Sequence, residues 1–200
     1  EKIKNSPTQM SLSPGSDETQ LNFAWYSKTC EIKPNLKISD NPEMKNSTAL
    51  QVTTTNATEG FKSNKATATD LKPNTRYYYS YTINGKWTKP TLYQTKNSKR
   101  YSFAFVGDPQ IGASWRCMPK DLSEDEIQDR AVRNDSFNWN NTIESIIKRD
   151  CNISFIISSG DQIQSRDKGK SNALYNKNEI EYSGYLSPSL LKSMPVATTI

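Results

Sequence analysis

The 200-residue sequence contains no histidine, and this absence excludes several classes of catalytic site. Without histidine, these residues cannot form a Ser-His-Asp or Cys-His arrangement, or the complete ligand set of a zinc hydrolase. Cysteine is scarce too, and Cys30, Cys117 and Cys151 show no metal-binding spacing. We interpret them as three separate thiols, with a Cys117–Cys151 disulfide as the alternative that a secreted protein would tolerate.

Long apolar runs are also missing, so no segment is expected to span a membrane. The net charge of +5 comes from 26 basic and 21 acidic residues that are interspersed along the chain. They form no arginine-rich stripe of the kind that binds nucleic acid, so no nucleic-acid partner is expected. The chain is long enough for two modest domains, and its start at Glu1 rather than methionine indicates processing or trimming.

Short runs of alternating apolar and polar residues, separated by turn signals, fill the first half of the chain. Residues 77–83 place Tyr77, Tyr79 and Tyr81 on one strand face, which we interpret as core packing rather than as a ligand platform. Asn84-Gly85 supplies the residues of a two-residue hairpin turn. Further short strands are expected at residues 21–26, 49–52, 65–69 and 86–88.

Residues 71–77 carry a more specific pattern, Leu-x-Pro-x-Thr-x-Tyr. It resembles the tyrosine corner of fibronectin type III domains, in which the hydroxyl bonds back to the chain upstream. The resemblance implies an all-β sandwich with Trp25 in its core. We place this domain at residues 1–96 and treat it as a scaffold, with a polar junction at 96–100.

The second domain, residues 97–200, is predicted to be the first part of an α/β fold. An apolar strand at 101–106 is followed by a helix that we expect Asn134, Asp135 and Ser136 to cap, and then by a strand at 153–158. A strand–helix–strand unit of this kind lays its two strands parallel. A helix near 179–192 and a third strand at 194–200 are expected to follow. The helical face that covers the strands is predicted to carry Trp139, Ile143, Ile146 and Ile147.

Both expected strands end in a Gly-Asp pair, at Gly107-Asp108 and Gly160-Asp161. One such aspartate alone is explained by turn chemistry. Two aspartates at equivalent ends of parallel strands could reach one small pair of cations if the strands are adjacent, because adjacent strands lie about 4.8 Å apart. The amide of Gln110 could ligate a metal, orient a water or face solvent. Neither strand leads into a glycine-rich phosphate loop, which disfavours a nucleotide-binding domain.

The order of these blocks resembles the calcineurin-like metallophosphoesterases, and in particular purple acid phosphatases, which carry a fibronectin-like domain ahead of the catalytic one. The resemblance implies hydrolysis of small phosphate mono- or diesters at a dinuclear metal site, in a secreted or cell-surface protein. Asp108 would bind one metal and Asp161 would bridge both. The Gly-Asn-His block and the catalytic acid are expected beyond Ile200, so these 200 residues alone are expected to be inactive.

Two positions depart from the family pattern. Gln110 stands where many relatives have histidine, and Gln164 stands where purple acid phosphatases have the tyrosine that binds ferric iron. The second departure predicts a colourless site, with Fe, Mn or Zn all open. The competing hypothesis is a cell-surface binding or adhesion protein with a degenerate, non-catalytic α/β domain. Histidines downstream of Ile200 would favour the phosphohydrolase over the adhesion protein. The sequence does not determine the substrate or the oligomeric state.

Overall fold

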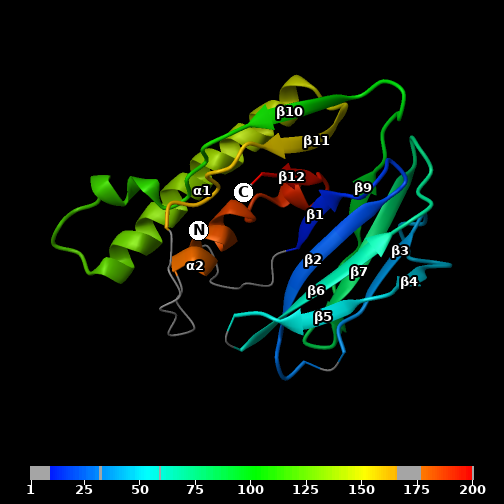
Figure 1. Ribbon diagram of the computed structural model, residues 1–200, viewed down its shortest axis with the longest axis horizontal. Coiled ribbons are helices and arrows are strands. Elements are labelled where there is room, and N and C mark those ends of the chain that lie inside the picture. The colour runs from blue at the N-terminus through cyan, green and yellow to red at the C-terminus, as the bar shows by residue number, and fades with distance from the viewer. Residues whose placement is uncertain (1–9, 32, 59, 166–176, 200) are drawn as a thin grey trace.

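The computed structural model describes residues 10–31, 33–58, 60–165 and 177–199. Figure 1 shows two parts, which we call the N-terminal sandwich (10–95) and the C-terminal part (101–199). The sandwich is built from antiparallel strands only, and the C-terminal part combines helices with a parallel sheet.

One sheet of the sandwich has the strand order β1-β2-β6-β5. Its strands are β1 (Ser11–Pro14), β2 (Leu21–Lys28), β5 (Thr53–Asn56) and β6 (Phe61–Ala68). The other sheet has the order β4-β3-β7-β8, with β9 also paired to β7. Its strands are β3 (Leu36–Ser39), β4 (Thr48–Leu50), β7 (Arg76–Ile83), β8 (Lys86–Trp87) and β9 (Thr91–Gln94).

The two sheets enclose an aromatic core that matches the predicted alternation. Trp25 is 2% exposed and lies 5.8 Å from the Tyr81 ring, while Phe23 meets Tyr79 edge-on at 5.0 Å. These side chains come from opposite sheets, so the alternating positions of β2 and β7 face each other. Burial of large aromatic side chains dominates the energetics of a core of this kind.

The predicted corner and hairpin are both present. The backbone N–H of Lys72 donates to the Tyr77 hydroxyl at 2.9 Å, five residues upstream of the tyrosine. Asn84 and Gly85 have φ of 51° and 73°, the left-handed pair that a tight hairpin requires. They place Ile83 opposite Lys86 in the β7–β8 pair. The strand expected at 65–69 starts earlier, because β6 follows β2 along its full eight residues.

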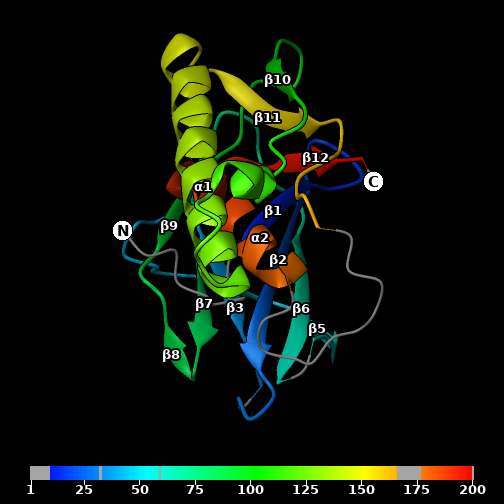
Figure 2. The same cartoon turned by 90° about the vertical axis from the view of Figure 1, so that its left-hand side faces the viewer.

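The C-terminal part contains a three-stranded parallel sheet in the order β10-β11-β12. Its strands are β10 (Ser102–Val106), β11 (Ile153–Ser158) and β12 (Val196–Thr198), and its helical segments are η1 (Ala113–Cys117), α1 (Glu124–Arg149), α2 (Lys177–Tyr185) and η3 (Ser189–Lys192). Helix α1 connects the adjacent strands β10 and β11, as the strand–helix–strand pattern predicted. Figure 2 shows α1 running along this sheet with α2 beside it.

The prediction that Asn134, Asp135 and Ser136 cap α1 was wrong, because all three lie inside the helix. The helix begins at Glu124, where Ser123 and Glu126 form a reciprocal capping box and three acidic residues occupy the first turn. Both features stabilise a helix N-terminus by satisfying free N–H groups and by favourable charge–dipole interaction.

The helix expected over 179–192 is also shorter than predicted. Helix α2 ends at Tyr185, and the separate 3-10 segment η3 starts after Pro188. Proline lacks an amide donor and disfavours helical backbone at the preceding residue, which here is Ser187. The third strand is confirmed at β12, while Ile200 lies outside the described residues.

One apolar cluster holds α1 and α2 against the parallel sheet. The indole of Trp139 stacks on Tyr185 at 5.4 Å, and its N–H donates to the Tyr185 carbonyl at 3.0 Å. The predicted face is confirmed for Trp139 and Ile143, which are 5% and 0% exposed. Ile146 packs against the same cluster as a partly buried residue.

Polar contacts join the sandwich to the C-terminal part. The Tyr79 hydroxyl donates to the Lys192 carbonyl at 2.7 Å, and the Ser193 hydroxyl donates to the Leu92 carbonyl at 2.6 Å.

Cys117 and Cys151 are exposed free thiols, so the alternative disulfide is not formed. Within the described ranges, no helix combines the length and apolar character needed to cross a membrane.

Candidate functional site

The two Gly-Asp pairs leave the same edge of the parallel sheet. Val106 and Ser158 are opposite each other at the ends of β10 and β11, and the Ser159 N–H donates to the Val106 carbonyl at 2.9 Å. A Cβ at Gly107 would meet the Ser159 hydroxyl, which would have to rotate away. Asp108 and Asp161 therefore follow adjacent strands at the same edge of the sheet.

The two loops stay paired beyond the strand ends. The Gln110 N–H donates to the Asp161 carbonyl at 2.9 Å, and the Ile111 N–H donates to the Gln162 carbonyl at 3.1 Å. The Gln164 N–H returns a bond to the Ile111 carbonyl at 3.1 Å. All three residues of the predicted site, Asp108, Gln110 and Asp161, thus belong to one hydrogen-bonded pair of loops.

These three residues also share an uncommon backbone conformation. Asp108, Gln110 and Asp161 have φ of 52°, 38° and 49°, and the described residues of the C-terminal part contain no other non-glycine residue with positive φ. Aspartate tolerates this region in ordinary turns, whereas glutamine adopts it rarely. Unusual backbone conformations cluster at functional sites, so their concentration at one sheet edge agrees with the predicted location.

The donor atoms suit a hard cation but are too few for a complete site. Both aspartates are exposed at the sheet edge, and Gln110 is partly exposed beside them. Carboxylate and amide oxygens are appropriate ligands for divalent cations. Among the described residues, however, no group of three His, Cys, Asp or Glu side chains could hold a metal ion. The residues present fit part of a metal site, and their role as ligands remains a prediction.

Two acidic residues that the sequence analysis did not assign to the site support the paired loops. Asp135 of α1 accepts hydrogen bonds from the backbone N–H groups of Gly112 and Ser114, at 2.9 and 3.1 Å. Glu181 of α2 accepts bonds from Ser165 and Gln128. The sequence does carry a signal for these two acids. Each stands four residues before a buried aromatic side chain, and residues four apart lie on the same face of a helix. These aromatic residues are Trp139 and Tyr185.

A cavity of about 500 Å³ opens beside the loops. It lies between η1, the N-terminal half of α1, the loop after β11 and α2. The residues that line it are Gly112, Trp115, Glu124, Ile127, Gln128, Gln164, Ser165 and Glu181. Gln164 therefore faces this cavity, while its backbone N–H bonds to the Ile111 carbonyl of the other loop.

Comparison with known proteins finds a family match for the first half of the chain. Residues 7–105 match the family model described as "Purple acid Phosphatase, N-terminal domain". No curated protein sequence matches the chain.

Two solved structures share its fold over nearly all of its length. Purple acid phosphatase PPD1 from yellow lupin (Lupinus luteus) seeds superposes with a TM-score of 0.62 at 14% identity, covering 95% of this chain and 34% of that one. The structure of PhoD superposes with a TM-score of 0.50 at 11% identity, covering 96% of this chain and 38% of that one. The chain spans little more than a third of either structure, and at these identities the likeness concerns the fold alone. Residues 7–105 are therefore similar to the N-terminal domain of purple acid phosphatases.

Proposed function

We propose that this chain is the N-terminal part of a secreted or cell-surface metal-dependent phosphohydrolase that cleaves phosphate mono- or diesters. The observation that carries the proposal is the pairing of the two Gly-Asp loops at one edge of adjacent parallel strands, directly after a purple acid phosphatase N-terminal domain. Carboxyl edges of parallel strands are where α/β folds bind their ligands.

In this proposal the two domains divide the work. Residues 1–96 form a fibronectin III-like scaffold, and residues 97–200 form the first part of a calcineurin-like metallophosphoesterase domain. The described sandwich residues contribute nothing to the loop pair. Their hydrogen bonds to Lys192 and Ser193 instead fix the segment that leads into β12, the third strand of the sheet.

The proposed ligands are Asp108 for one metal ion, Asp161 bridging two ions, and the side-chain amide of Gln110. When bound, a pair of divalent or trivalent cations supplies electrostatic stabilisation for the hydrolysis of a phosphate ester. The residues of this chain hold both carboxylates at one edge through the Gln110–Asp161 backbone bond and leave them open to solvent. With glutamine at position 164 there is no phenolate ligand, so Fe, Mn or Zn in a colourless site fits the proposal.

The first prediction concerns metal binding by the chain itself. We expect Mn²⁺ to bind the wild-type chain with a dissociation constant on the order of 1 mM, because two carboxylates make only a partial site. Broadening of amide NMR signals by the paramagnetic ion should centre on residues 107–111 and 160–164. The Asp161→Asn variant should lose this localised broadening.

The matched control is Asp70→Asn in the sandwich. Asp70 is also an exposed aspartate with positive φ, at 58°, and asparagine tolerates that conformation as well as aspartate does. This substitution should leave the Mn²⁺ effect unchanged. Broadening spread evenly over surface carboxylates, or unaltered in Asp161→Asn, would contradict the proposed function.

A further inference from the structure

Glu181 is a buried carboxylate for which the proposed function gives no role. Its side chain lies on α2 with 2% exposure. Ser165 donates to it twice, through the backbone N–H at 2.7 Å and through the hydroxyl at 2.8 Å. The Gln128 side chain of α1 donates to it at 2.8 Å. A carboxylate is buried at reasonable cost only when such donors replace water.

The loop after β10 packs against the same carboxylate. A Cβ at Gly112 would collide with Glu181 Oε1, so backbone rather than side chain fills the space beside the carboxylate. Gly112 also has φ of 105°, a conformation that glycine adopts without strain. Close packing on Glu181 and the backbone angle therefore both specify glycine here.

The position of these contacts along the chain links them to the predicted ligands. Gly112 stands four residues after Asp108, and Ser165 stands four residues after Asp161. Between the aspartates and these anchor points, the two loops are bonded to each other through the pairs that involve Gln110, Ile111 and Gln164. One carboxylate thus hydrogen-bonds the second loop and packs against the first, at equal distances along the chain from the two aspartates.

We propose that Glu181 is a positioning residue for the Asp108–Asp161 pair. It hydrogen-bonds the end of the second loop and packs against the end of the first, so that the two carboxylates are held at one sheet edge and can bind one cation site together. Asp135 supports the first loop, through Gly112 and Ser114, so it cannot replace Glu181 on the second. The inference rests on the proposed function, since it assigns the pair a metal to bind.

The test uses the ¹⁵N-labelled chain and its Glu181→Gln variant, with Mn²⁺ as the probe. Glutamine keeps the size of the side chain but removes its charge, so the bonds from Ser165 and Gln128 are no longer charge-assisted. Two quantities are measured. The first is amide hydrogen exchange at Gln110, Ile111 and Gln164 without metal, and the second is Mn²⁺ affinity from signal broadening near both aspartates.

We expect exchange at these three amides to rise about 10-fold, because the loop pair opens more readily once the bonds to residue 181 are weakened. We expect Mn²⁺ affinity to fall about 10-fold, the lower end of the range seen when residues that orient metal ligands are replaced. The Ser165→Ala variant, which removes only the hydroxyl bond, should shift both quantities in the same direction by less.

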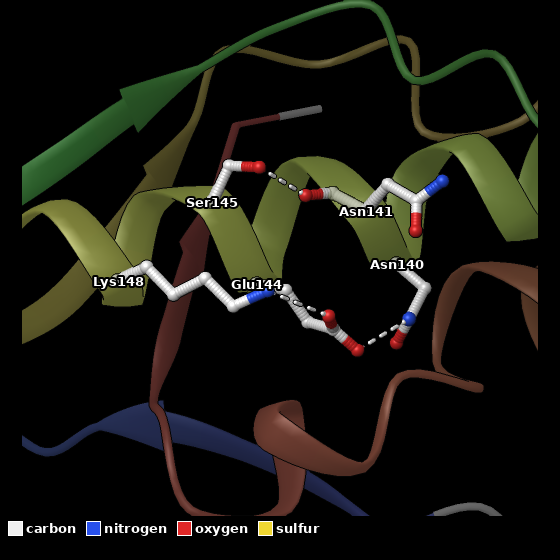
Figure 3. A network of polar contacts seen from close by, with 5 residues as sticks. All are labelled: Asn140, Asn141, Glu144, Ser145 and Lys148. Atoms are coloured by element: carbon white, nitrogen blue, oxygen red, sulfur yellow. Dashed lines mark hydrogen bonds and ion pairs between the residues drawn. The ribbon is translucent and has the colours of Figure 1, made fainter.

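The control is Glu144→Gln on the exposed side of α1. Figure 3 shows its carboxylate bonded to Asn140 and Lys148, at 2.9 and 3.5 Å, within the helix itself. This variant makes the same chemical change without a contact to either loop. It should leave exchange at the three loop amides and Mn²⁺ affinity unchanged.

The outcomes separate the two proposals. Unchanged exchange in Glu181→Gln would overturn the anchoring role, even with metal binding intact in the wild type. Faster exchange with unaltered Mn²⁺ affinity would show that Glu181 is structural only and would overturn its positioning role. No localised Mn²⁺ binding by the wild type would contradict the proposed function and, with it, the positioning role, while the exchange data would still report whether Glu181 anchors the loops.

Discussion

At the scale of single residues, left-handed backbone angles mark where the chain turns sharply. Some of these positions are plain turns, such as Asn84-Gly85 in the β7–β8 hairpin. Others coincide with a close contact between segments far apart in sequence, as at Gly112 beside Glu181. The Asn-Gly pair was enough to predict the first kind from sequence. The need for glycine at 112, however, depends on the side chain of Glu181, 69 positions further along the chain.

Replacement of Gly112 by alanine tests this distinction. Gly60 offers a matched control, because it has φ of 81° but no atom within 4 Å of the point where a Cβ would stand. We expect Gly60→Ala to lower the free energy of unfolding by about 1–2 kcal/mol through backbone strain alone. Gly112→Ala should cost at least about 1 kcal/mol more, because it adds overpacking against Glu181. Urea denaturation of both variants measures the difference, and equal losses would argue against the crowding at Gly112.

At the scale of elements, α1 shows how a capping signal can be misplaced. The Asn134–Ser136 segment contains three residues favoured at helix starts, but Ser123 and Glu126 form the actual capping box. Asp135 sits inside the helix because its carboxylate bonds outward to Gly112 and Ser114 rather than to its own backbone. Its tertiary role overrides the local preference of aspartate for helix caps.

Loss of the capping box should destabilise the helix in a pH-dependent way. The hydrogen bonds from Ser123 lower the pKa of Glu126 below its ordinary value. A carboxylate with a lowered folded-state pKa stabilises the fold above its unfolded pKa, and this contribution is lost as pH falls through the folded value. Ser123→Ala should therefore lower the free energy of unfolding at pH 7. This loss of stability should be smaller in acid. Thermal unfolding of wild type and variant at neutral pH, and at a pH below the folded-state pKa of Glu126, measures the loss at each pH. An equal loss at the two pH values would exclude the Glu126 carboxylate as the cause.

At the scale of the whole molecule, the sandwich and the C-terminal part meet through a half-buried carboxylate as well as through backbone acceptors. The Tyr26 hydroxyl of β2 donates to Glu179 of α2 at 3.5 Å. Burial raises the pKa of Glu179, and the bond from Tyr26 opposes this only in part. A small cavity of about 150 Å³ lies next to this contact, between β2, β6 and α2.

The raised pKa of Glu179 gives a prediction with a defined sign. A carboxylate whose folded-state pKa is raised binds its proton more tightly in the folded state, so stability falls as pH rises from the unfolded value through the folded one. Glu179→Gln keeps an acceptor for Tyr26 and removes the charge. The variant should be more stable than the wild type in mildly alkaline buffer and similar to it in acid below the unfolded pKa, as judged by melting temperature. A variant less stable than the wild type in the alkaline buffer would show that the ionised carboxylate is favourable at this contact.

Local patterns were enough to predict the sandwich strands with strong alternation, the Tyr77 corner, the hairpin at Asn84-Gly85 and the parallel pair that ends in Asp108 and Asp161. Shorter strands were missed, among them β3, in which Leu36 and Ile38 alternate with polar residues, and β5, whose four residues are all exposed. Its place in the sheet comes from pairing with β6 rather than from burial of its own side chains.

The order of residues along the chain is therefore sufficient to specify which segments have a buried face and where two carboxylates follow two strands, because alternation and turn chemistry act between near neighbours. The support of the loops by Glu181 and Asp135, and the bond from Gln110 to Asp161, follow instead from how the elements pack. These contacts join residues that are far apart along the chain. Their geometry is set when α1 and α2 pack beside the sheet, and no short stretch of sequence carries that information.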